Sequence, residues 1–216
     1  MINTLTQSIN NIIVNISMVL LCIWVVLEMP SVHLCRWFLR AIIIIATVLF
    51  SVYVPLYHGY NLLILMHSVV GDLSITTLFI LLLLIFQDFF ISSGWEINFN
   101  VMNRSVSWIV FIIGIIFYIS RFGLIINFDL YKLGYYPQYT LLFLIFLELV
   151  IWYINKIFAL IWLIALIAFY FKFQSSVNLW DYMYDPVLLI IALYKGLVNK
   201  ELTKPNQPFK ISTFTN

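Results

Sequence analysis

Long apolar stretches separated by short polar breaks make up most of the chain. They cover residues 12–27, 41–57, 73–91, 105–120 and 137–173. A helix needs about 20 mostly apolar residues to cross the hydrocarbon core of a bilayer. The first stretch reaches that length if its helix begins at Ile9. The pattern therefore predicts a series of membrane-spanning helices.

The last stretch, 137–173, is too long for one spanning helix. At 1.5 Å per residue it would extend about 55 Å, against a hydrocarbon core of about 30 Å. Its charged residues are Glu148 and Lys156. Two helices joined near Asn155 and Lys156 fit the membrane better, and Pro137 suits the first turn of the earlier helix.

Two other apolar segments are too short to cross. Residues 58–71 have an apolar middle at 62–66, which indicates a re-entrant or interfacial helix. Gly71 ends this helix, and Asp72 then occupies the N-cap position of the helix over 73–91. Residues 187–194 form the second short apolar segment.

The composition agrees with a bilayer as solvent. The chain is 64% hydrophobic and 9% charged, whereas a soluble domain carries about 25% charged residues. We therefore expect an all-α membrane protein, a polytopic bundle of about six transmembrane helices with one or two short re-entrant or interfacial helices. Residues 1–198 form its single domain and 199–216 a polar, flexible tail. The expected location is the inner membrane of a bacterium, with an organelle's membrane as the alternative.

Basic residues give a prediction of orientation, and the net charge bears on partners. With the N-terminus inside, seven Lys and Arg residues fall on the inner side and four on the outer side. Positive residues favour the cytoplasm, so both termini are predicted there, although Arg36 and Arg40 in the first connector oppose this.

The net charge of +2 is too small to indicate nucleic acid. The expected partners are the lipid bilayer and another membrane protein or a second copy.

Glu148 is the most unusual candidate residue, because it lies near the middle of a predicted span. A charged side chain there costs at least about 2.5–3.5 kcal/mol on the insertion scale. It could relay protons, bind a polar head group or contact another subunit. The structural alternative is a hydrogen bond to a neighbouring helix.

His58, His67 and Asp72 form a second candidate group. Histidines can shuttle protons or ligate metals, but no metal-binding spacing is present. At a membrane interface, histidine is also common for its amphipathic character alone. The capping position of Asp72 gives that residue a structural role as well.

Asp181 and Asp185 are four residues apart, which places two carboxylates on one helix face, as Mg²⁺ binding requires. Together with Asn178 they partly resemble the acidic motif of membrane prenyltransferases. The second copy of that motif is missing, and the chain is short for that family. Pro186 also disfavours helix at the residue before it, so Asp185 is better interpreted as the N-cap of the next helix.

Three functions remain open. The leading one is a non-catalytic subunit or assembly factor of a membrane complex. The second is a membrane-embedded enzyme for a lipid-linked substrate, whose candidate polar groups are His58, His67, Asp72, Glu148, Asp181 and Asp185. The third is a small transporter with Glu148 as its coupling residue. The sequence identifies no cofactor.

Overall fold

A computed structural model describes residues 2–33, 35–94, 99–122 and 129–198 of the chain. The described residues are helical apart from connectors and one short hairpin, so the fold is all-α, as predicted. The elements are α1 (Ile2–Leu27), α2 (Pro30–His33), α3 (Trp37–Tyr53), β1 (Pro55–Tyr57), β2 (Tyr60–Asn61), α4 (Leu62–Val70), α5 (Ile75–Ser92), α6 (Arg104–Arg121), the 3-10 helix η1 (Leu130–Tyr135), α7 (Pro137–Ile154), α8 (Lys156–Tyr170), α9 (Leu179–Met183) and α10 (Pro186–Val198). The predicted tail, 199–216, lies outside the described residues.

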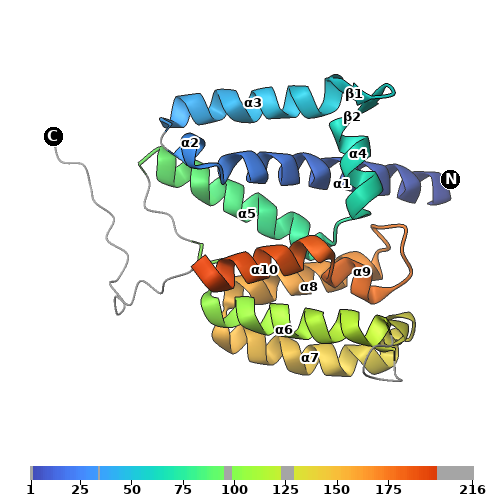
Figure 1. Cartoon of the computed structure of the whole chain (residues 1–216). Helices are drawn as coiled ribbons and strands as arrows, with labels where there is room; N and C mark the ends of the chain where they lie inside the picture. Colours follow the sequence, from blue (N-terminus) through green and yellow to red (C-terminus); the bar gives the residue numbers. More distant parts are fainter. Residues whose placement is uncertain (1, 34, 95–98, 123–128, 199–216) are drawn as a thin grey trace.

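The long helices lie roughly side by side, alternating in direction, in two groups (Figure 1). In the first group, α1 packs on α3 and α5, and α4 crosses close to α1 and α3. In the second group, α10 packs on α6, and α7 packs on α8. Contacts of α5 with α8, α9 and α10 join the groups. At this junction lie fully buried Ile80, Leu81, Trp162, Tyr182 and Leu188.

The break predicted inside 137–173 is confirmed. Helix α7 begins at Pro137 and ends at Ile154, and α8 begins at Lys156. Asn155 separates them and caps α8, because its Oδ1 accepts hydrogen bonds from the backbone N–H groups of Ile157 and Phe158. An N-cap side chain satisfies donors that a helix start leaves free.

The second predicted span, 41–57, is shifted in the structure. Helix α3 ends at Tyr53, because Pro55 disfavours helix at Val54, which is extended at φ −87° and ψ 114°. Strands β1 and β2 then pair as an antiparallel hairpin. His58 and Gly59 form its turn, with φ of 47° and 84°. The short helix predicted after it is confirmed as α4.

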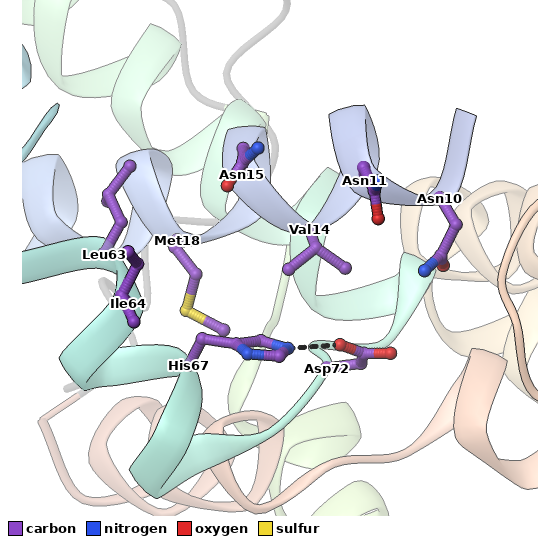
Figure 2. A pocket seen from close by; sticks show the side chains of 9 residues that line it. All are labelled: Asn10, Asn11, Val14, Asn15, Met18, Leu63, Ile64, His67 and Asp72. Atoms are coloured by element: carbon purple, nitrogen blue, oxygen red, sulfur yellow. Dashed lines mark hydrogen bonds and ion pairs between the residues drawn. The ribbon is translucent and has the colours of Figure 1, made fainter. Parts of the chain in front are cut away.

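The prediction that Asp72 caps the third span is wrong. Helix α5 begins at Ile75 and its N-cap is Ser74, whose side chain accepts from the backbone N–H of Thr77. Gly71, at φ 76°, turns the chain after α4. Asp72 consequently points back toward His67 instead of forward along α5 (Figure 2).

The second short segment, 187–194, belongs to a longer helix, α10. It runs antiparallel to α6, since Gly114 in the middle of α6 faces Leu189 and Gly196 near the end of α10 faces Trp108. A methyl group on Gly114 would collide with Leu189. Small residues of this kind let two helices approach closely.

Three helical segments are long and apolar enough to cross a membrane: Ser8–Leu27, Ile75–Ser92 and Arg104–Arg121. Four further apolar helices, α3, α7, α8 and α10, are shorter over the residues whose side chains the structure describes. The helical character expected of a membrane protein is therefore present in the described residues.

Candidate functional site

Most buried polar side chains gather at the end of the bundle where α1, α5, α7 and α10 begin, which we call the cavity end. Hydrogen bonds there join segments far apart in sequence. The backbone N–H of Ser175 donates to Oδ1 of Asn10 at 3.1 Å, and that of Ser74 donates to Oδ2 of Asp185 at 2.8 Å. The polar groups of this end form two sets with different surroundings.

The first set surrounds Asp185, which is 3% exposed. Its Oδ1 accepts from the backbone N–H of Leu188 at 2.7 Å, which confirms the predicted N-cap of α10. Its Oδ2 accepts from the Ser74 N–H and from the Thr77 hydroxyl, the latter at 2.5 Å. One carboxylate therefore satisfies donors at the starts of two helices, α5 and α10.

Asp181 has different partners. It accepts from the Tyr131 hydroxyl at 3.0 Å and from the Ser176 hydroxyl at 2.5 Å. Burial and the negative charge of Asp181 raise the pKa of the Tyr131 phenol above its ordinary value, which keeps it a hydrogen-bond donor. The guanidinium of Arg121 lies 4.3 Å from the centre of the Tyr131 ring.

These bonds bear on the Mg²⁺ hypothesis for Asp181 and Asp185. The two carboxylates are held by separate sets of protein donors. Within the part of the chain that the structure describes, no three His, Cys, Asp or Glu residues are grouped to hold a metal ion. The geometry favours structural roles for both aspartates.

Gln174 and Asn178 complete this set. The amide of Gln174 donates to the carbonyl of Leu73 at 2.7 Å. Asn178 donates to the carbonyl of Tyr131 at 3.0 Å and caps α9 by accepting from the Trp180 N–H. Backbone groups away from water need such partners. The helix breaks around α9 leave backbone groups without helical partners. The side chains of this set provide hydrogen-bond partners for such groups inside the protein.

The second set lines an open cavity of about 410 Å³ between α1 and α4 (Figure 2). His67 Nε2 and Asp72 Oδ1 are 2.6 Å apart, and their side chains are 45% and 39% exposed. The remaining lining residues are Asn10, Asn11, Val14, Asn15, Met18, Leu63 and Ile64. Unlike the first set, these groups are accessible to a ligand.

Two features of the sequence place these groups together. Asn11 and Asn15 are one helical turn apart on α1, and Asn10 precedes them, so all three amides line the cavity. The turn at Gly71 brings Asp72 onto the last turn of α4, where His67 lies. The sequence pointed to His67 and Asp72 as candidates but not to the asparagines that line the same cavity. Their amide side chains within an apolar stretch were the signal that could have found them.

The other two candidates lie elsewhere. His58 is in the turn of the hairpin, with its ring 4.2 Å from that of Tyr57. Glu148 is on α7, on the other side of the bundle from α4 (Figure 1). Its Oε2 is buried and has no hydrogen-bond partner among the described residues. The structure thus brings together His67 and Asp72 but not His58 or Glu148.

Comparison of the chain with protein-family models, curated proteins and solved structures finds no match. The fold and site define an all-helical bundle with membrane-compatible helices and a polar cavity at one end. A function must be argued from that geometry.

Proposed function

We propose that the chain is a polytopic integral membrane protein whose cavity binds the polar head group of a lipid or lipid-linked molecule. The observation that carries the proposal is the paired His67 and Asp72 beside three asparagine amides, in a cavity whose other walls are apolar. In this proposal the six spans expected from the sequence are α1, α3, α5, α6, α7 and α8. The bacterial inner membrane remains the predicted location.

The bilayer part of the proposal is supported by the exposed apolar surface. Leu142, Phe146 and Leu149 on α7 are 74%, 64% and 66% exposed, and α3 has a similar apolar surface. Soluble monomers rarely expose continuous apolar patches of this kind. Lipid chains are the natural cover for both helices.

The lining limits the class of head group. Asparagine amides both donate and accept hydrogen bonds, which suits hydroxyl and amide groups. No Lys or Arg is among the lining residues, and Asp72 is acidic. A diphosphate would lack cationic partners there, so a sugar, polyol or amide head group fits better. The volume also lies in the range of ordinary ligand sites.

The His67 and Asp72 pair supplies the chemistry that the second sequence hypothesis requires. Asp72 holds one ring nitrogen of His67, which fixes the orientation of the imidazole. Nδ1 is then left to exchange a proton with a head-group hydroxyl, the geometry expected of a general base or acid. The proposal thus favours the enzyme hypothesis. The accessory-subunit and transporter hypotheses stay predictions.

Native mass spectrometry of the protein, extracted from its own membrane in a mild detergent, tests the proposal. We expect a retained lipid of defined mass on the wild-type protein. It should be lost or much reduced in an Asn11→Leu/Asn15→Leu variant, and retained in a His58→Gln control, whose changed side chain lies outside the cavity.

Two results would count against the proposal. One is a wild-type protein without any lipid, and the other is equal lipid retention in the asparagine variant, checked for an unchanged unfolding temperature. A second protein bound at fixed stoichiometry would instead support the accessory-subunit hypothesis.

A further inference from the structure

The second end of the bundle is defined by its own polar contacts, and we call it the basic end. Arg40 at the start of α3 donates to Asp88 at the end of α5 at 2.8 Å. Lys195 near the end of α10 lies 3.7 Å from Glu28, which follows α1. These contacts place the last turn of α10 beside the last turn of α1, at the opposite end from the cavity.

Helix α10 therefore passes from one end of the bundle to the other. Tyr184, just before it, stacks on Phe117 near the end of α6, with ring centres 6.2 Å apart. Gly196, near its own end, faces Trp108 at the start of α6. Its 13 residues extend about 20 Å at 1.5 Å per residue. Helix α9, whose apolar side chains are buried, precedes it at the cavity end.

The basic residues are divided unequally between the two ends. Five described Lys and Arg residues lie at the basic end and three at the cavity end; these are Arg36, Arg40, Arg104, Lys156 and Lys195 against Arg121, Lys132 and Lys172. In the sequence, Lys200, Lys204 and Lys210 follow α10, and no apolar stretch separates them from it. Described acidic residues show the reverse bias, with Asp72, Asp129, Asp181 and Asp185 at the cavity end against Glu28 and Asp88 at the basic end.

We propose that the protein crosses the membrane with its basic end in the cytoplasm and its cavity open to the opposite side. Lys and Arg close to the ends of spans are retained in the cytoplasm. This reverses the orientation expected from the sequence. That expectation treated 187–194 as too short to cross, and so it placed the basic tail on the same side as the N-terminus. With α10 as a seventh span, the N-terminus of α1 is outside and the end of α10 is inside.

The orientation specifies the source of the ligand, and this consequence rests on the proposed function. A head group reaches the cavity from the non-cytoplasmic face, between the start of α1 and α4. The ligand is therefore a molecule displayed in the outer leaflet. A soluble cytoplasmic metabolite has no access to it.

Cysteine labelling in spheroplasts of a bacterial host tests the orientation. The native Cys35 reports the basic end, beside Arg36. A Cys35→Ser/Val177→Cys variant reports the cavity end, because Val177 is 69% exposed there. Cys35→Ser alone is the control, since its remaining thiol, Cys22, is buried.

With a membrane-impermeant maleimide, we expect the Val177→Cys variant to be labelled in intact spheroplasts and Cys35 only after permeabilisation. The opposite pattern would overturn the proposal. So would labelling of both positions under the same condition, because the five proposed spans between them, α3, α5, α6, α7 and α8, would then not place the two ends on opposite sides of the membrane. Neither failure would affect lipid retention measured by mass spectrometry, so the orientation and the proposed function fail separately.

Variants that remove basic residues test whether these residues determine the orientation. Replacing Arg36, Arg104 and Lys156 with glutamine leaves two described basic residues at the basic end against three at the cavity end, and a fraction of chains should then expose Cys35 in intact spheroplasts. The matched change of Lys132 and Lys172 to glutamine should leave the orientation unchanged. Unchanged labelling in the first variant would refute the charge argument.

Discussion

Replacement of Asp185 by asparagine tests whether its carboxylate holds the cavity end together. Both oxygens are in use: Oδ1 accepts from Leu188, and Oδ2 accepts from Ser74 and Thr77. Asparagine has only one acceptor oxygen. In either orientation, its NH₂ group therefore faces a buried backbone N–H that loses its partner.

The cost follows from that lost partner. A buried donor left unsatisfied costs about 1–3 kcal/mol, so we expect Asp185→Asn to lower the free energy of unfolding by about 2 kcal/mol. For a chain of this size, that corresponds to a fall of about 4–8 °C in the unfolding temperature. Asp181→Asn is the matched control. The partners of Asp181 are the hydroxyls of Tyr131 and Ser176, which can rotate toward the remaining oxygen, and its cost should stay below about 1 kcal/mol.

Thermal unfolding followed by tryptophan fluorescence in detergent, at one scan rate for both variants, measures the difference. A larger fall for Asp185→Asn is the expected result. Equal falls, or a larger fall for Asp181→Asn, would refute the assignment of Asp185 as the cap shared by α5 and α10. If both variants instead lost lipid binding equally and kept their stability, the hypothesis that Asp181 and Asp185 act together as a pair would be supported.

Three other changes test the packing and charges. Gly134→Ala places a methyl group 2.6 Å from the Trp180 ring and should cost about 2 kcal/mol of stability in the same thermal assay. Gly196→Ala places its methyl group 3.2 Å from the Trp108 ring and should cost less. A double-mutant cycle of Arg40→Gln and Asp88→Asn should give a coupling of about 1–2 kcal/mol, because both side chains are largely buried; a coupling near zero would deny the ion pair. The raised pKa of Tyr131 means that its stabilising contribution is complete below pH of about 10 and is lost as the pH rises further. A Tyr131→Phe variant should therefore lose less stability than the wild type as the pH rises from about 10 to about 12 in alkaline titrations, and equal losses would contradict this.

The parts of the fold that the sequence predicted depend on local signals. The break at Asn155, the start of α7 at Pro137 and the cap at Asp185 each follow from one residue type at one position. Such signals act within a turn or two of the chain. They need no knowledge of which helices are neighbours.

The parts that were missed depend on contacts between distant segments. Helix α10 continues through Lys195, whose side chain lies 3.7 Å from Glu28 after α1, whereas the sequence alone shows a charge ending an apolar run. The hairpin at 55–61 has too few residues for a strand pattern to be visible. The proposed orientation differs from the one expected from the sequence because it counts α10 as an extra crossing.

The candidate site shows how a local signal can also mislead. A glycine followed by an aspartate ahead of an apolar helix indicates an N-cap, and Asp72 fits that pattern. In the structure, Ser74 caps α5, and its N–H donates to Asp185 from α10's start, 111 residues away in sequence. The distant carboxylate thus makes a capping role for Asp72 unnecessary, and Asp72 pairs with His67 instead. Asp185 satisfies backbone and hydroxyl donors within the fold, whereas Asp72 is accessible in the cavity. For this reason the proposed function places its chemistry on His67 and Asp72.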